Sequence, residues 1–233
     1  FREYTDLVEP LALDEAYLDV TENHRGLPHA TAVAIQIRER VRSEVGLTAS
    51  AGVSSTKLVA KIASDLDKPD GLVVVKPHQV EAFLTPLPIE RLWGVGQATA
   101  ARLKALGMET IGDVRQRSLV DLERALGSLG RFVHKLSRGV DERTVNPHRV
   151  AKSRSAERTF ATDLDELEEM RAVLVELASD VAQSLRKLQR PGRTVTLKVR
   201  YSDFTTLTRS QTLPGFTDES RLIAEAALQL LDR

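Results

Sequence analysis

The sequence of 233 residues contains no cysteine, which excludes disulfide bonds and thiolate metal sites. This absence is compatible with a reducing compartment without requiring one, and we expect a cytoplasmic protein. The five histidines show none of the paired spacings found in zinc sites. The sequence also has no apolar run near the roughly 20 residues of a membrane-spanning helix, and no secretory signal opens it. We therefore expect no membrane partner.

The formal net charge is zero, which on its own argues against a nucleic-acid partner. The charges are unevenly spread, however. Residues 1–22 contain seven acids and one base, residues 143–161 five bases and one acid, and residues 186–211 seven bases and one acid. An acidic region together with basic ones favours a metal-dependent enzyme that acts on a polyanion, although charge runs are also common on solvated surfaces. Hydrophobic residues at 42% and charged residues at 28% indicate an ordinary globular chain of one large or two to three small domains.

Two adjacent carboxylates, Asp14 and Glu15, interrupt an apolar stretch that runs from Leu11 to Thr21. The stretch predicts a strand, and successive strand residues point to opposite faces, so at most one acid can face a core. An unpaired buried carboxylate is strongly unfavourable, which favours a cation beside it. Mg²⁺ takes oxygen ligands, commonly one or two carboxylates together with substrate phosphates. These residues therefore predict a metal site for phosphoryl or nucleotidyl transfer. The alternative is a turn between two short strands that faces water.

Helices and strands alternate after this stretch. Apolar residues at i, i+3 and i+4 spacing predict a helix that begins at Pro28 and that Gly46 ends. Small residues predict a short strand at 48–54, and a second amphipathic pattern predicts a helix over 58–66. Residues 69–75 predict a turn followed by a buried strand. The alternation predicts an α/β layer whose sheet includes the acidic stretch.

The motifs of this first part are Leu13–Val20, Ala51–Ser54, Leu58–Asp65, Lys68-Pro69 and Gly71. Their sequences and order resemble the Y-family DNA polymerases, in particular the bacterial DNA polymerase IV (DinB) branch. The resemblance implies that Asp14 and Glu15 are catalytic ligands of two Mg²⁺ ions and that Lys68 reaches the triphosphate of the incoming nucleotide. Two metals about 4 Å apart can activate a primer 3′-oxygen and neutralise the leaving pyrophosphate. The alternative for Lys68 is a solvent-exposed turn lysine.

The sequence departs from the family pattern in two ways. Ala12 stands where relatives commonly have a serine before the acidic motif. The first-strand metal aspartate, the steric-gate aromatic residue and the fingers subdomain would lie before Phe1. We therefore expect the chain as given to hold two of three metal carboxylates and to be incomplete for activity.

A Gly-hydrophobic-Gly turn, Gly94-Val95-Gly96, lies between two predicted helices and is typical of a helix-hairpin-helix. Its glycines let the backbone approach a phosphate, and N–H groups at the start of the next helix bind that phosphate. We predict DNA contacts for these three residues and for Lys104, although such turns also simply join helices. The small helices expected over 108–138 suit the thumb of the same family.

The last part of the chain predicts a βαββα order. Residues 153–160 alternate like a strand, a long helix ends near Leu188, and two further strands precede a helix over 218–231. This order lacks the closing strand of a ferredoxin-like fold and resembles the little finger of the Y family. In that domain the open face of the sheet lies along the DNA. The candidate DNA contacts by position are Arg154, Ser155, Arg158 and Arg209, for which the alternative is exposed strand residues.

The resemblance thus implies a multidomain α+β protein. Its parts are a partial palm with a mixed sheet (1–77), an all-α thumb (78–143), a linker (144–152) and a truncated little finger (153–233). The implied activity is template-directed, low-fidelity translesion DNA synthesis, which transfers a dNTP to a primer 3′-hydroxyl. The implied partners are primer–template DNA, dNTP and a sliding clamp, whose binding peptide is not seen here, and we expect a monomer.

Two other hypotheses remain open at this point. The chain could be a non-catalytic DNA-binding fragment, because the first-strand aspartate and the fingers are missing. It could also belong to a helix-hairpin-helix repair enzyme, such as a glycosylase or a nuclease, and for the glycosylase Asp113 is available as the catalytic residue. The second hypothesis leaves the acidic stretch without a role.

Overall fold

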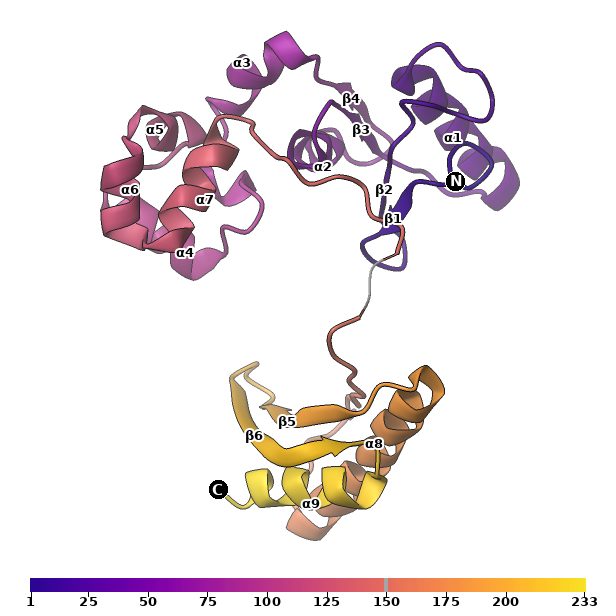
Figure 1. Cartoon of the computed structure of the whole chain (residues 1–233), viewed down its shortest axis with the longest axis vertical. Helices are drawn as coiled ribbons and strands as arrows, with labels where there is room; N and C mark the ends of the chain where they lie inside the picture. Colours follow the sequence, from indigo (N-terminus) through magenta and orange to yellow (C-terminus); the bar gives the residue numbers. More distant parts are fainter. Residues whose placement is uncertain (149–150) are drawn as a thin grey trace. The chain divides into compact units, whose positions relative to one another are not determined.

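The computed structural model describes residues 1–148 and 151–233 (Figure 1). The chain divides into two compact units, formed by residues 1–149 and 150–233. The division falls inside the range where we predicted a linker, and Arg149 and Val150 of that range lie outside the described residues. Among the described residues, each sheet has only two strands.

The first unit begins with a short antiparallel pair, β1 (Val8–Pro10) and β2 (Ala16–Leu18), in which Glu9 lies opposite Tyr17. Helix α1 (Ala30–Val45) follows and ends, as predicted, at Gly46 in the left-handed conformation. Strand β3 (Ala51–Val53), helix α2 (Lys57–Leu66) and strand β4 (Leu72–Val74) then form the predicted alternation, with β3 and β4 parallel.

The strand that we predicted through the acidic stretch is wrong for residues 11–15 and is present only at β2. Residues 11–15 form a turn between β1 and β2, closed by a hydrogen bond from the N–H of Leu11 to the carbonyl of Glu15 (2.8 Å). The β1–β2 pair is also separate from the β3–β4 sheet. The physical reason is local: Ala12, Leu13 and Asp14 are all exposed, so no core holds this part of the chain in a sheet. The alternative interpretation, a turn between two short strands, describes the observed backbone.

Strand β3 packs directly against α2. A Cβ added at Gly52 would lie 2.0 Å from the carbonyl oxygen of Ala60, so only glycine permits this approach. The contact fixes α2 on the β3–β4 sheet and so fixes the side chains that α2 projects.

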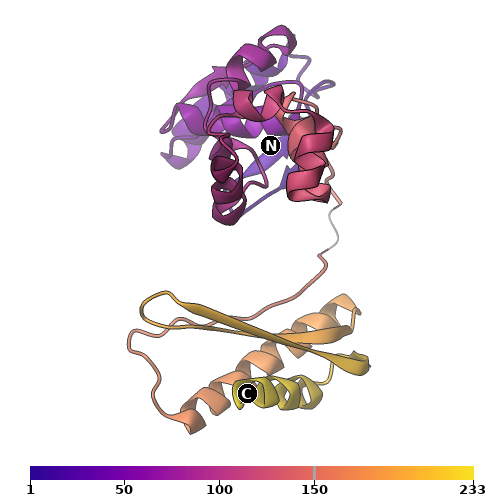
Figure 2. The ribbon, with the colours of Figure 1, turned by 90° about the vertical axis from the view of Figure 1, so that its left-hand side faces the viewer.

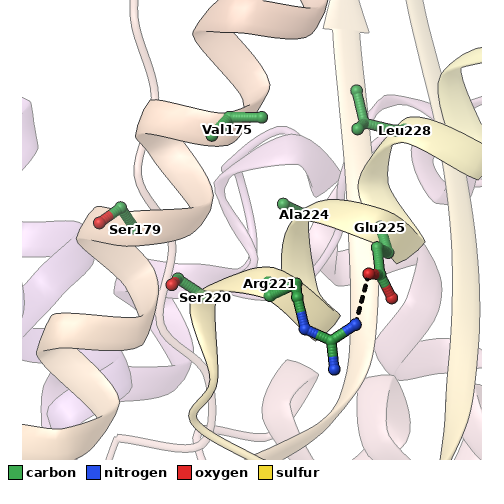
Figure 3. Close-up of a pocket in the computed structure, with 7 residues that line it drawn as sticks. All are labelled: Val175, Ser179, Ser220, Arg221, Ala224, Glu225 and Leu228. Carbon is green, nitrogen blue, oxygen red and sulfur yellow. Dashed lines mark hydrogen bonds and ion pairs between the residues drawn. The ribbon is translucent and has the colours of Figure 1, made fainter.

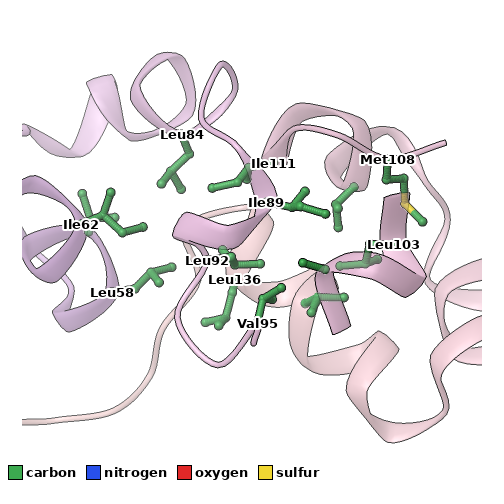
Figure 4. Packing of buried hydrophobic residues seen from close by; sticks show 14 of the residues in the cluster. Leu58, Ile62, Leu84, Ile89, Leu92, Val95, Leu103, Met108, Ile111 and Leu136 are labelled. Atoms are coloured by element: carbon green, nitrogen blue, oxygen red, sulfur yellow. The ribbon is translucent and has the colours of Figure 1, made fainter. Parts of the chain in front are cut away.

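The rest of the first unit is helical, as predicted for a thumb. Its elements are η1 (Pro77–Gln79), α3 (Val80–Leu84), η2 (Ile89–Arg91), α4 (Gln97–Ala105), α5 (Ile111–Gln116), α6 (Leu119–Leu126) and α7 (Ser128–Ser137). A single apolar core runs from Leu58 and Ile62 of α2 through Leu84 and Leu103 to Leu136 of α7 (Figure 4). The boundary that we predicted between residues 77 and 78 therefore lies within one continuous core.

A strap of residues 141–146 leaves the last thumb helix and runs back past α2 to β1 (Figure 1). The carboxylate of Asp141 accepts the N–H of Leu58 in the first turn of α2 (2.9 Å) and pairs with Arg143 (2.6 Å). The Asp141 side chain is only 2% exposed. Its contacts tie the end of the thumb to the start of α2.

The Asp141 carboxylate should make the stability of the first unit depend on pH. Burial raises its pKa, but hydrogen bonds from Arg143 and the N–H of Leu58 outweigh burial, so the pKa lies below its ordinary value. A lowered folded-state pKa stabilises the fold above the unfolded-state pKa of about 3.9, and this stability is lost as pH falls through the folded-state pKa. We expect Asp141→Asn to destabilise the unit by about 1–3 kcal/mol at pH 7 and by progressively less in acid.

Denaturation followed by the fluorescence of Trp93, the single tryptophan of the chain, measures this effect. The matched control is Glu142→Gln, because the neighbouring Glu142 side chain is 78% exposed and pairs only at the surface with Lys135. A deficit of Asp141→Asn that stayed constant down to pH 3 would contradict the role of its charge.

The second unit consists of α8 (Leu167–Leu188), β5 (Gly192–Arg200), β6 (Thr206–Thr217) and α9 (Ser220–Leu231). The antiparallel β5–β6 ribbon forms one layer and the two helices form the other (Figure 2). An open groove between α8 and α9 is lined by Val175, Ser179, Ser220, Arg221, Ala224, Glu225 and Leu228 (Figure 3). None of the residues that we predicted to bind metal, nucleotide or DNA lines this groove.

The strand predicted at 153–160 is absent, although all of these residues are described. Alternation would place Arg154 and Arg158 on the same face as Ala156 and Phe160, so that face has little apolar surface to bury. Phe160 is 38% exposed. The unit therefore has the order αββα where we predicted βαββα.

Candidate active site and nucleic-acid interface

The acidic turn between β1 and β2 presents the two predicted carboxylates differently. Asp14 is exposed, whereas Glu15 is partly buried and pairs through Oε1 with Nζ of Lys61 on α2 (3.2 Å). Glu15 is therefore held by a cation of the chain itself, and Asp14 extends into solvent beside it.

Lys61 belongs to a chain of charges that joins Glu15 to Lys68. Nζ of Lys61 lies 3.0 Å from Oδ2 of Asp65, and Oδ1 of Asp65 lies 2.6 Å from Nζ of Lys68. Burial lowers the pKa of Lys61, but its hydrogen bonds to Asp65 and Glu15 outweigh burial and leave the pKa above its ordinary value. The structure thus brings together two residues that we predicted separately, Glu15 and Lys68, through two that we did not.

Lys61, Asp65 and Lys68 follow i, i+4 and i+3 spacing, which predicts neighbouring charges on a helix surface. That signal could have identified the α2 side of the cluster. Its link to Glu15 spans 46 positions of sequence, and no local pattern predicts it.

The acidic turn was predicted to hold a metal ion. Within residues 1–148 and 151–233, no group of three or more His, Cys, Asp or Glu side chains is placed to hold a metal ion. Two adjacent carboxylates nevertheless match the donors that Mg²⁺ takes when substrate phosphates complete its coordination. Asp14 and Glu15 therefore fit a magnesium site that the nucleotide helps to form.

The predicted hairpin connects η2 to α4. Gly94 has a φ of +85° and a Cβ there would lie 2.9 Å from the Phe132 ring, so the turn requires glycine. Val95 is 7% exposed, its side chain packs in the core, and its N–H bonds to the carbonyl of Leu92 (3.0 Å). Val95 thus anchors the turn and does not present its side chain to solvent.

Gly96 is the N-cap of α4 and has no side chain with which to cap the helix. The first amides of a helix have no partner within it, and the helix dipole favours an anion there. A Cβ built at Gly96 meets no atom of the described residues within 4 Å, so the space beside this N-cap glycine is open. The start of α4 therefore has the backbone geometry of a phosphate-binding site.

Lys104 lies seven residues further along α4, about 10 Å from that site at the rise of an α-helix. Its Nζ pairs with Glu90 (2.5 Å), and this hydrogen bond raises the pKa of Lys104. The structure does not bring Lys104 to the amides of the hairpin. Instead Arg143 of the strap stacks on Trp93, beside Gly94, with its guanidinium carbon 4.1 Å from the ring centroid. These two residues are 50 positions apart, and the sequence gives no signal for their contact.

The remaining candidates lie in the second unit, three of them in irregular chain and one on a strand. Arg154, Ser155 and Arg158 lie in irregular chain, and Arg158 pairs with Glu176 of α8 (2.8 Å). Arg209 lies opposite the buried Leu197 and donates to the carbonyl of Leu230 in α9 (3.3 Å), so it is on the face of the ribbon that packs against the helix.

The other face of the ribbon carries hydroxyl and basic side chains that we did not select. Thr194 pairs with Thr212 at 3.2 Å between hydroxyl oxygens, and Thr196 pairs with Ser210 at 2.9 Å. Lys198 lies opposite Thr208 and Arg200 opposite Thr206 on the same face. The alternation of Thr196, Lys198 and Arg200 with apolar residues was the signal that could have identified this surface.

Asp113 has a structural role that argues against the glycosylase hypothesis built on it. Its Oδ2 accepts the N–H groups of Glu109 (2.9 Å) and Thr110 (2.8 Å), which completes a capping box at the start of α5. These hydrogen bonds, that of Thr110 first, lower the pKa of Asp113. A carboxylate that accepts two backbone N–H groups in this way serves the helix cap and is not free to act on a substrate.

Comparison with known proteins adds to this geometry. The family models that match are described as impB/mucB/samB family (residues 1–65), DNA polymerase-iota, thumb domain (90–141), and impB/mucB/samB family C-terminal domain (151–233). A curated DNA polymerase IV of Alkalilimnicola ehrlichii is 54% identical over 210 residues, which is 90% of this chain. A DNA polymerase IV of Listeria monocytogenes is 47% identical over 231 residues, or 99% of this chain. The chain belongs to the Y family of DNA polymerases, in its bacterial DinB branch.

Solved structures agree with this membership. A chimeric Y-family DNA polymerase, 25% identical, superposes with a TM-score of 0.79 over 97% of this chain and 65% of its own. DinB from Sulfolobus solfataricus shares the fold at 23% identity and a TM-score of 0.55, over 97% of this chain and 66% of its own. The mixed fold and the helix-hairpin-helix thumb that we predicted are confirmed. This Y-family chain spans 59% of the Alkalilimnicola relative and 65% of the Listeria relative.

The Y-family matches cover the candidate residues unevenly. Asp14 and Glu15 lie within the first matched segment, the hairpin within the thumb segment, and the β5–β6 ribbon within the C-terminal segment. Lys68 lies just outside the first matched segment. In the parts of the chain that the structure describes, no helix has both the length and the apolar character for crossing a membrane.

Proposed function

We propose that this chain is the palm, thumb and little-finger part of a low-fidelity translesion DNA polymerase. The reaction transfers the nucleotide of a dNTP to a primer 3′-hydroxyl and releases pyrophosphate. The observation that carries the proposal is the charge cluster in which Lys61 and Asp65 join Glu15 of the acidic turn to Lys68. Carboxylates for metal and a lysine for phosphate on one surface are the groups that nucleotidyl transfer requires.

Asp14 and Glu15 would hold two Mg²⁺ ions together with a further carboxylate and the nucleotide phosphates. These ions, when bound, lower the pKa of the attacking hydroxyl and stabilise charge on the leaving group. Lys68 is 52% exposed, so its ammonium can turn from Asp65 to the triphosphate and add positive charge there. Lys61 keeps Glu15 directed at the site when the metals are absent.

The DNA would be held without base recognition. The open amides at Gly96 bind a backbone phosphate, and the hydroxyl and basic face of β5–β6 offers further phosphate contacts with Lys198 and Arg200. The same mode of binding extends to Arg154, Ser155 and Arg158. We further propose primer–template DNA and dNTP as substrates, a sliding clamp as a partner, and a monomer acting in the cytoplasm.

A second candidate is a non-catalytic DNA-binding fragment. The observation in its favour is that the described residues gather fewer than three metal-ligating side chains at the acidic turn. Duplex binding and primer extension, measured on this 233-residue chain and on a polymerase of the relatives' full length that carries this sequence, separate the two candidates. We expect both proteins to bind and only the longer one to extend primers. A longer protein that binds but does not extend would overturn the polymerase proposal.

The hairpin provides a specific test of DNA binding. Gly96→Val places a side chain in the open space before the α4 amides, and loss of one charge-assisted phosphate contact should weaken duplex binding about tenfold or more. The control is Ala105→Val, which adds two methyl groups and produces the same side chain at the exposed far end of α4. Equal affinities for the two variants would remove the hairpin from the interface.

A further inference from the structure

The base of the acidic turn rests on Lys57, the first residue of α2. Glu9 and Tyr17 face each other across β1 and β2, immediately before and after the turn. Nζ of Lys57 pairs with Oε2 of Glu9 (2.5 Å) and lies 4.8 Å from the centroid of the Tyr17 ring. The side chains of Lys57 and Glu9 are each 11% exposed, so this pair is nearly buried. One ammonium group therefore contacts both strands that support Asp14 and Glu15.

The strap reaches the same ammonium and the same carboxylate from the other side. The carbonyl oxygen of Thr144 accepts a hydrogen bond from Nζ of Lys57 (3.2 Å), and the N–H of Asn146 donates to Oε2 of Glu9 (2.7 Å). Two strands, one helix and the strap thus meet at a single ion pair. The other end of the strap carries Arg143, which stacks on Trp93 beside the hairpin.

The placement of Lys57 is electrostatically unusual. A helix dipole disfavours a cation in the first turn, and burial further disfavours an ammonium unless it is paired. Lys57 is tolerated there because Glu9, Tyr17 and Thr144 surround it. The turn itself has little other support: its closing hydrogen bonds, from Leu11 and Ala12 to Glu15, are internal to it. Its attachment to α2 then depends on Lys57 at the base and Lys61 at Glu15.

We propose that Lys57 and the strap position the acidic turn, so that seating of residues 141–146 on Glu9 sets the geometry with which Asp14 and Glu15 meet a divalent cation. This inference rests on the proposed role of Asp14 and Glu15 as metal ligands. Lys57 is a positioning residue, because it contacts Glu9, Tyr17 and Thr144 and acts on Asp14 and Glu15 only through the strands. The strap connects the acidic turn to the hairpin, because its Arg143 stacks on Trp93 beside Gly94.

Lys57→Met tests the proposal in a polymerase of the relatives' full length that carries this sequence, because the proposed metal site includes a further carboxylate beside Asp14 and Glu15. It keeps the length of the side chain and removes the charge that holds Glu9 and Thr144. We expect hydrogen exchange of the amides in residues 11–18 to accelerate at least tenfold and the affinity for Mn²⁺ alone, measured by electron paramagnetic resonance, to fall severalfold. Lys57→Arg should restore both, because a guanidinium can pair with Glu9 and stack on Tyr17. The control is Lys135→Met, a surface lysine that is 52% exposed and pairs with Glu142.

Two variants at one position test the strap. Asn146→Pro removes the N–H that bonds to Glu9, whereas Asn146→Ala keeps it and removes only the side chain. We expect the proline variant to reproduce the faster exchange in residues 11–18 and the alanine variant to match the parent protein. The two variants change the same residue, so they differ only in the backbone N–H and the side chain. A general loss of folding would instead lower the thermal stability of the whole first unit and would not be confined to residues 11–18.

The outcomes separate this proposal from the proposed function. If Asp14→Asn weakens Mn²⁺ binding while Lys57→Met leaves both exchange and binding unchanged, the positioning role is overturned and the metal site stands. If Lys57→Met accelerates exchange in the turn while Asp14→Asn leaves Mn²⁺ binding unchanged, the turn is positioned as proposed and the metal role of its acids fails.

Discussion

Asp14→Asn and Glu15→Gln, introduced singly into a polymerase of the relatives' full length that carries this sequence, should each lower primer extension at least about 100-fold. Both substitutions keep the size of the side chain and remove the charge that holds a divalent cation. Removing one preorganised electrostatic contact to a transition state commonly reduces the turnover rate by about 10²–10³. Steady-state extension of a primed template at saturating dNTP and Mg²⁺ measures the effect.

The control for both acids is Glu22→Gln. Glu22 is an exposed acid of the same N-terminal region, so it tests whether loss of negative charge alone matters. Duplex affinity should stay within about twofold for all three variants, because phosphate contacts lie on other elements. Extension that stayed within about threefold of the parent for Asp14→Asn and Glu15→Gln would remove both residues from the metal site.

The two acids should differ in one further respect. Glu15 is held by Lys61, whereas Asp14 is exposed. Glu15→Gln leaves Lys61 with one carboxylate partner, Asp65, and so should also change how Asp65 and Lys68 share their ion pair. We expect Glu15→Gln to raise the KM for dNTP in addition to lowering turnover, and Asp14→Asn to act on turnover alone.

The parts of the fold that the sequence predicted are those where one local pattern decides the structure. Helix α1 ends at Gly46 because the left-handed conformation there suits glycine, and α2 follows from a strongly periodic apolar face. The hairpin was predicted from Gly94 and Gly96. The backbone of Gly94 requires glycine, and Gly96 leaves open space at the start of α4. These features need no knowledge of distant residues.

The predictions that were wrong concern strands, whose existence depends on partners. The acidic stretch and residues 153–160 both alternate in a way that permits a strand. Residues 153–160 form none, and in the acidic stretch only Ala16–Leu18 does, while Asp14 and Glu15 lie in the turn before it. Arg209 was selected by its position in the resemblance, but register places it opposite Leu197 and turns it toward α9. A shift of one residue exchanges the faces of a strand, so composition alone could not assign its side.

The contacts that define the site are long-range. Glu15 meets Lys61, Glu9 meets Lys57 and Asn146, and Arg143 meets Trp93, all through the packing of separate segments. Residue types could suggest which groups carry chemistry, but only the fold shows which cation serves which carboxylate. The family resemblance identified Asp14, Glu15 and Lys68, and it gave no role to Lys57, Lys61 or Asp65.

Leu103→Ala should produce the largest loss of stability predicted here, about 2–5 kcal/mol in the free energy of unfolding of the first unit. Leu103 of α4 is 0% exposed and belongs to the core that runs from α2 to α7. Truncation removes apolar contacts and leaves a cavity that the neighbouring helices cannot fully close. Urea denaturation followed by Trp93 fluorescence measures this unit specifically, since the chain has no other tryptophan.

The matched control is Leu106→Ala, three residues along the chain at the C-cap of α4, where the side chain is 45% exposed. Its loss should stay below about 1 kcal/mol, because little area leaves a packed interior. Leu103 also holds the helix whose first amides face the proposed phosphate, so Leu103→Ala should weaken duplex binding as the unit begins to unfold, whereas Leu106→Ala should not. Equal losses of stability for the two leucines would mean that α4 is not packed on the core as described, and the hairpin would then lose the support that presents its amides to DNA.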